Sequence, residues 1–118
     1  MGASGRSIPS EGPRYKSITP GELKERLDRR EALVLLDVRE PWEVALARIE
    51  GSKLIPMAEI LDRAAELDPE AYTVVICHHG ARSAYVTQLL DHSSFEAVYN
   101  LEGGLDTYSA VDDSVPRY

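Results

Sequence analysis

The chain contains a single cysteine among its 118 residues, and this scarcity sets the first limits on its chemistry. One cysteine excludes an internal disulfide and a four-cysteine zinc site, and it suits a reducing compartment. No apolar run reaches the roughly 18 residues that a membrane helix needs, and no signal-peptide core lies near the start. We therefore expect a cytoplasmic protein with no membrane partner.

Positive charge is also scarce, because 13 lysines and arginines face 20 aspartates and glutamates, for a net charge of −7. This balance argues against binding to nucleic acids. The content of 43% hydrophobic and 28% charged residues is that of an ordinary globular protein. The length predicts one domain over 14–118, and the Gly-, Ser- and Pro-rich stretch 1–13 predicts a flexible leader or linker.

The most informative stretch is TVVICHHGARS, over 73–83. Its β-branched run predicts a strand buried on both faces, and Cys77 stands directly at the strand end. A polar loop with Gly80 follows, and the spacing of 84–90 predicts a helix. Unpaired N–H groups and the dipole at a helix start favour the thiolate form of a nearby cysteine, and Arg82 adds a positive charge. The alternative is a small apolar cysteine ending a core strand, but this combination of residues favours a nucleophile.

Further strands and helices alternate along the rest of the chain. Thr19, Pro20 and Glu22 form a capping-box pattern that predicts a helix start. We expect strands at 15–18, 33–37, 53–56, 73–76 and 97–101, and helices at 20–30, 41–47, 60–67, 84–90 and 105–110. This alternation predicts an α/β domain whose mainly parallel central sheet of about five strands is covered by helices on both faces.

In a parallel sheet of this kind, sites lie beyond the carboxyl ends of the strands. Asp37, Cys77 and Asn100 all fall at such strand ends. The expected fold and the cysteine motif therefore indicate the same edge of the sheet.

The segment CHHGARS over 77–83 resembles the active-site loop of the rhodanese family, sulfurtransferases that carry sulfur as a cysteine persulfide. The similarity extends over most of 15–118. LDVRE at 36–40 with Glu43, IEGSKLIP at 49–56 and NLEGG at 100–104 are similar to further signatures of that family. The chain departs from the family at Ala47 and Arg48, where a Gly-His pair is usual.

The resemblance implies a rhodanese-like fold and a transferase of the thiosulfate sulfurtransferase type. Sulfur would pass from thiosulfate or a protein persulfide, through Cys77, to a small thiol, cyanide or a sulfur-carrier protein. No cofactor or metal is expected. The resemblance assigns catalysis to Cys77 and donor binding to His78, His79, Gly80, Ala81, Arg82 and Ser83.

Loop length distinguishes a sulfurtransferase from the enzymatic alternative, which is a phosphatase or arsenate reductase on the same scaffold. Four residues lie between Cys77 and Arg82, whereas the related phosphatase loops have five. A longer ring of N–H donors suits a tetrahedral oxyanion, so the shorter loop favours a single sulfur atom. A non-catalytic rhodanese-like binding module is the third possibility, and the presence of both Cys77 and Arg82 argues against it.

Two residues outside the loop are expected to support it. Asp37 would fix backbone donors, and Arg39 would pair with a carboxylate such as Glu43; the alternative is a surface ion pair. Because His78 and His79 are adjacent, we expect them to face different directions, which disfavours a shared metal ion.

Overall fold

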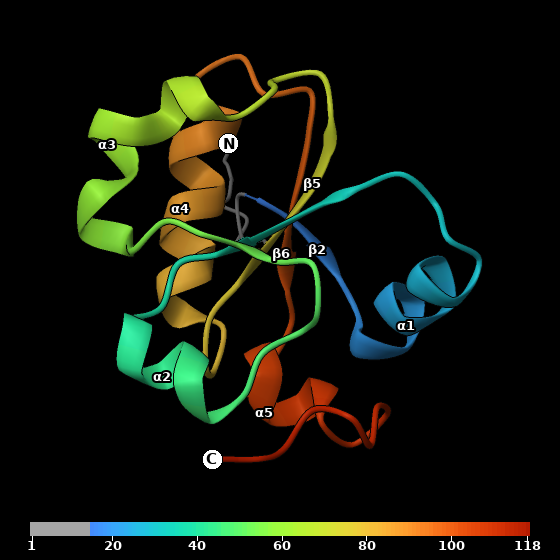
Figure 1. The fold of residues 1–118 in the computed structure, drawn as a ribbon. Helices are drawn as coiled ribbons and strands as arrows, with labels where there is room; N and C mark the ends of the chain where they lie inside the picture. Colours follow the sequence, from blue (N-terminus) through green and yellow to red (C-terminus); the bar gives the residue numbers. More distant parts are fainter. Residues whose placement is uncertain (1–14) are drawn as a thin grey trace, which may run out of the picture.

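The computed structural model describes residues 15–118, which form an α/β domain. One parallel β-sheet has helices on both of its faces (Figure 1). The leader expected at 1–13 lies outside the described residues. The five strands are β2 (Lys16–Ile18), β3 (Val34–Asp37), β4 (Lys53–Leu54), β5 (Tyr72–Ile76) and β6 (Ala97–Leu101). They pair side by side in the order β2-β6-β5-β3-β4, and every pairing is parallel.

The α-helices are α1 (Pro20–Asp28), α2 (Pro41–Leu46), α3 (Ile60–Arg63), α4 (Ala81–Asp91) and α5 (Gly104–Tyr108). Two 3-10 turns, η1 (Met57–Glu59) and η2 (Ala64–Glu66), flank α3. The capping box predicted at the start of α1 is present, since the backbone N–H of Glu22 donates to the Thr19 side chain and Glu22 accepts from the backbone of Thr19. The predicted α/β architecture is confirmed.

The central strand β5 shows how the sheet separates two cores. Its side chains alternate: Val74 and Ile76 pack into one apolar cluster, and Val75 packs with Cys77 into the other. The first cluster includes residues of α1 and α5, and the second includes residues of α3 and α4 (Figure 1). Burial on both faces explains the unbroken β-branched run of this strand.

The helix expected at 60–67 is not continuous. Residues 57–66 form η1, a four-residue α3 and η2, with the backbone N–H of Leu67 donating to the carbonyl of Ala64 three residues earlier. Ile60 is buried, whereas 80% of Leu61 is exposed. The connection from β4 to β5 therefore anchors its few buried side chains through tight turns rather than through one apolar helix face.

Helix α4 begins three residues earlier than expected, at Ala81. Its N-cap is Gly80, at φ +101°, and the backbone N–H of Ala84 donates to the Gly80 carbonyl at 3.1 Å. Gly80 therefore allows the chain to turn from strand into helix within three residues of Cys77. The first turn of α4 is consequently part of the loop around the thiol.

Candidate active site

Cys77 lies directly after β5, at the carboxyl edge of the sheet, and 1% of it is exposed. Its side chain belongs to the same apolar cluster as Val86 and Leu90 of α4. Because β5 is the central strand and α4 packs against it, the position of the sulfur is fixed on two sides.

The loop directs polar hydrogens at the sulfur. The backbone N–H of Gly80 donates to Sγ of Cys77 at 3.0 Å, and the backbone N–H of Ser83 donates to it at 3.3 Å. The Ser83 hydroxyl lies 3.2 Å from Sγ and donates to Oδ1 of Asn100 at 2.5 Å. Ser83 and Asn100 are themselves buried, and their hydrogen bond holds the Ser83 hydroxyl in place. Such an arrangement stabilises negative charge on sulfur.

The N–H groups point inward because the loop carbonyls are bound from outside. The backbone N–H groups of Leu105 and Asp106 donate to the carbonyls of Cys77 and His78 at 2.9 and 3.0 Å. The start of α5 comes this close because Gly104 has no side chain, and a Cβ there would overlap both of these carbonyl groups. The loop is thus clamped between its own helix, α4, and the first turn of α5.

Arg82 of this loop makes a bidentate ion pair with Glu43. Its Nη1 and Nη2 atoms lie 2.6 and 2.9 Å from Oε1 and Oε2 of Glu43, on α2. The hydrogen bonds from Arg82, with further ones from the Glu40 backbone and Tyr118, lower the pKa of Glu43 to about 2. The same pair raises the pKa of Arg82. Both groups are therefore charged throughout the neutral range.

Asp37 and Arg39 form a second ion pair. Arg39 donates from Nε and Nη2 to the Asp37 carboxylate, at 2.9 and 2.7 Å, and both side chains are buried. Arg39 pairs with a carboxylate, as expected, but its partner is Asp37 rather than Glu43, of which Arg39 reaches only the main-chain carbonyl. The reason is proximity, because Asp37 stands two residues away at the end of β3. The alternative of a surface ion pair does not hold for this buried pair.

Tyr118 joins these groups from the far end of the sequence. Its hydroxyl accepts from Nη1 of Arg39 at 2.7 Å and donates to Oε2 of Glu43 at 3.0 Å. Burial raises the pKa of Tyr118, so the hydroxyl keeps its proton for Glu43. Its ring stacks on His78 with centroids 3.9 Å apart, and its carbonyl oxygen lies 2.9 Å from Nε2 of that histidine.

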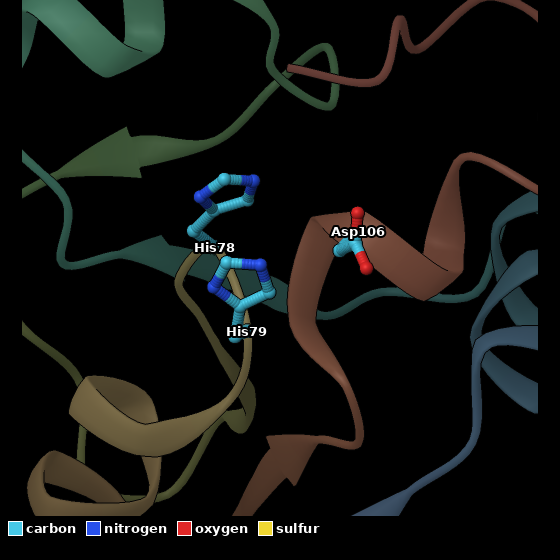
Figure 2. Close-up of side chains that lie close together, drawn as sticks. All are labelled: His78, His79 and Asp106. Carbon is cyan, nitrogen blue, oxygen red and sulfur yellow. The ribbon is translucent and has the colours of Figure 1, made fainter.

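His78 and His79 do not face different directions, contrary to expectation. Their rings stack with centroids 3.9 Å apart, and Asp106 of α5 lies beside them (Figure 2). These three residues offer ligand atoms within 4.8 Å of one another. However, stacked rings direct their in-plane lone pairs side by side rather than at one point, and Asp106 is bound by Nε of Arg117 at 3.0 Å. The contacts favour a hydrogen-bonded stack over a metal site.

Of the loop positions named from the sequence, two touch the sulfur of Cys77 and the others do not. Gly80 and Ser83 touch Sγ, whereas Arg82 and His78 contact other side chains, and Ala81 and His79 are exposed. The sequence reasoning missed Tyr118, Gly104 and Asp106. Gly104 stood inside a recognised signature, but nothing local to Tyr118 indicates that it reaches the site.

Among residues 15–118, no helix combines the length and apolar character needed to cross a membrane.

Comparisons with known proteins indicate one family. Residues 19–111 match the model of the rhodanese-like domain. The chain is 40% identical over 90 residues to the putative sulfurtransferase YtwF of Bacillus subtilis, covering 76% of this chain and 86% of that protein. It is 30% identical over 97 residues to the thiosulfate sulfurtransferase GlpE of Pseudomonas putida, covering 82% and 87%.

Longer proteins also contain the same domain. Against the rhodanese-like/PpiC domain-containing protein 12 of Arabidopsis thaliana, the chain is 40% identical over 89 residues, which are 71% of this chain and 30% of that protein. Among solved structures, a rhodanese-related protein from Thermoplasma volcanium superposes with a TM-score of 0.78 at 31% identity, covering 88% of this chain and all of that one.

Proposed function

Because the chain belongs to the rhodanese-like domain family, we propose that it is a sulfurtransferase that carries sulfur as a persulfide on Cys77. Its donor is thiosulfate or a protein persulfide, and its acceptor is a small thiol, cyanide or a sulfur-carrier protein. Relatives named as sulfurtransferases at 30% and 40% identity support this chemistry. We place the reaction in the cytoplasm, where a lone thiol stays reduced.

One observation carries the proposal. Sγ of Cys77 receives the backbone N–H groups of Gly80 and Ser83, at 3.0 and 3.3 Å, at the start of an 11-residue helix. Backbone donors fixed in this way stabilise a thiolate before the reaction and a persulfide anion after it. A cysteine that served only to fill the core would need no such donors.

The reaction follows from this arrangement in two steps. The Cys77 thiolate attacks the outer sulfur of the donor and forms a new S–S bond. The bond between that sulfur and the rest of the donor breaks, and the rest leaves as sulfite or as a thiolate. The N–H groups of Gly80 and Ser83 then face the charge of the bound persulfide. A nucleophilic acceptor attacks the outer sulfur of that persulfide and restores the Cys77 thiolate.

The size of the loop favours this reaction over phosphate or arsenate chemistry on the same scaffold. Two loop N–H groups and the Ser83 hydroxyl already lie within 3.3 Å of Sγ. A tetrahedral oxyanion in this position would need a wider ring of donors than four intervening residues supply. A binding module without catalysis is the remaining alternative, and the same experiment tests it.

The experiment is intact-protein mass spectrometry after incubation with thiosulfate or with an organic persulfide. We expect the mass to rise by one sulfur atom, and added cyanide to remove that sulfur as thiocyanate. Cys77→Ser, which should keep the fold because serine is nearly isosteric, is the control and should gain nothing. A folded wild-type protein that gains no sulfur from either donor would refute the proposal.

A further inference from the structure

The fixed positive charges around Cys77 are already matched by carboxylates. Both prongs of the Arg82 guanidinium are bound to Glu43, at 2.6 and 2.9 Å, and Arg39 is bound to Asp37. Arg117, near the histidine stack, is bound to Asp106. Within the described residues 15–118, an anionic donor that enters this site therefore meets no arginine whose charge is free.

The Arg82–Glu43 pair is not easily opened by a ligand. The side chain of Glu43 is only 5% exposed, and it also accepts hydrogen bonds from the backbone N–H of Glu40 and from the Tyr118 hydroxyl. If Arg82 turned toward a donor, Glu43 would be left as a buried carboxylate without its cation, which is costly. Arg82 is consequently a structural cation, and the charge that the loop offers to a reactant comes from its N–H groups.

Next to the loop, the surface is hollowed and mainly apolar. Met57, Ala81, Arg82 and Tyr85 line this hollow, in which Ala81 and Arg82 belong to the active loop itself. Tyr85 stands one turn further along α4, and 57% of it is exposed. Because two of its lining residues belong to the active loop, the hollow is the place where an apolar group of the donor would lie.

Building on the proposed sulfurtransferase activity, we propose that the donor is a small organic sulfane compound with one negative charge and an apolar substituent, rather than inorganic thiosulfate. Thiosulfate is a dianion, and its sulfonate charge would lose water without gaining a free cation. An organic substituent of the same donor instead gains apolar contact with Met57 and Tyr85. The net charge of −7 acts in the same direction, because it repels a dianion more than a monoanion.

The chemical step is the same for either type of donor. The Cys77 thiolate forms a bond to the sulfane sulfur of a thiosulfonate, R–SO₂–S⁻, and the bond between that sulfur and the sulfonyl sulfur breaks. The bonding pair leaves with the sulfinate R–SO₂⁻, and Cys77 retains a persulfide anion. Reactants and products each carry two negative charges, and no proton or external oxidant is required.

Three donors that share the reacting group test the proposal: thiosulfate, methanethiosulfonate and benzenethiosulfonate. The measurement is the second-order rate constant for sulfur gain by Cys77, divided by the rate constant of free mercaptoethanol with the same donor to remove differences in leaving group. We expect benzenethiosulfonate to react fastest and thiosulfate slowest, with at least about tenfold between them, equivalent to about 1.4 kcal/mol. Equal or faster reaction with thiosulfate would overturn the inference while leaving the sulfurtransferase intact. If no donor transfers sulfur, both fall.

Two variants separate charge from apolar contact. Glu43→Gln frees the charge of Arg82, so the rate with thiosulfate should rise about tenfold relative to methanethiosulfonate. Glu66→Gln makes the same change of net charge at an exposed ion pair with Arg63, and it should leave this ratio unchanged. Because the ratio is taken within one preparation, partial unfolding cancels.

Tyr85→Ala addresses the hollow, and since Tyr85 is exposed the fold should tolerate it. The preference for benzenethiosulfonate over methanethiosulfonate should fall at least threefold, roughly the loss of one exposed aromatic contact. Leu61→Ala removes another exposed apolar side chain, on α3, and serves as its control. A preference that Tyr85→Ala and Glu43→Gln both leave unchanged would refute the assignment of the donor.

Discussion

The site has two parts that are built in different ways. The floor consists of Cys77, Gly80, Ser83 and Asn100, and it holds the sulfur mainly through backbone N–H groups. The rim consists of Glu43, Arg82, His78 and Tyr118, and it is held by side chains 39 to 75 residues apart in sequence. The floor serves one sulfur atom whatever donor brings it, whereas the rim determines what charge and shape the donor meets. We therefore expect changes in the floor to affect the reaction itself, and changes in the rim to affect stability and donor preference.

The largest effect is expected from widening the floor. Inserting one glycine between His79 and Gly80 moves the loop N–H groups away from Sγ and enlarges the ring of donors. Sulfur transfer should fall at least about a hundredfold, as on removal of a preorganised donor from an oxyanion hole, and phosphate or arsenate should become better inhibitors. Rates and inhibition constants measure this, with circular dichroism to confirm folding. A glycine inserted between Ser93 and Ser94, in an exposed turn, is the control. A folded loop insertion that keeps full transfer and gains no oxyanion affinity would show that loop length does not select the reaction.

The floor also depends on the close approach of α5, which Gly104→Ala should disrupt. Gly104 has φ +64°, and a Cβ there would overlap the carbonyl groups of Cys77 and His78. The left-handed conformation and the overlap together should lower the free energy of unfolding by about 3 kcal/mol, and sulfur transfer should fall as the loop shifts. Gly21→Ala in α1 is the matched control, because nothing lies within 4 Å of its Cβ position and alanine favours a helix. Urea denaturation should show the control at least as stable as the wild type, and an equal result for Gly104→Ala would contradict the clamp.

The rim predicts a specific acid sensitivity. Hydrogen bonds from Arg82 lower the pKa of Glu43 from 4.5 to about 2, so the native state favours the ionised form. The ionised Glu43 therefore contributes about 3 kcal/mol to the free energy of unfolding. This contribution is complete above pH ~4.5 and is lost as the pH falls toward ~2. In Glu43→Gln, which cannot titrate there, the free energy of unfolding should fall by about 3 kcal/mol less over that interval. Other carboxylates are present in both proteins and cancel. Parallel slopes of stability against pH for the two proteins would contradict the strength of the pair.

The same contrast explains what the sequence could predict. The order of strands and helices follows from local patterns: the apolar run before Cys77, the capping box at Thr19 and the glycines at 103 and 104. Most of the floor was predictable for the same reason, since Cys77, Gly80 and Ser83 lie within seven residues of one another and only Asn100 comes from further along the chain. The strand–loop–helix geometry alone brings the first three together.

The rim could not be predicted in this way. Arg82 has Glu43 as its partner, and Arg39 has Asp37, yet both carboxylates stand near both arginines in sequence or in the expected fold. The choice depends on where the turn after β3 directs each side chain. The stacking of His78 on His79 likewise depends on Tyr118, whose ring covers His78 and arrives from 40 residues away.

The smallest effect is expected from Tyr118→Phe, which separates the two contributions of this residue to the rim. Phenylalanine keeps the ring that stacks on His78 but removes the hydroxyl that lies between Arg39 and Glu43. Losing hydrogen bonds to two charged groups should lower the free energy of unfolding by about 1 kcal/mol, less than a fully buried pair because Tyr118 is partly exposed.

Sulfur transfer from benzenethiosulfonate should change less than about threefold in Tyr118→Phe, since neither the donors to Sγ nor the Arg82–Glu43 contact is removed. Tyr118→Ala also removes the stack on His78 and should lower the free energy of unfolding by a further ~1 kcal/mol. Urea denaturation and single-turnover rates for both variants decide the matter. If Tyr118→Phe alone abolished transfer, the hydroxyl would act on the reacting sulfur itself, and the division between a floor that performs the reaction and a rim that supports it would be wrong.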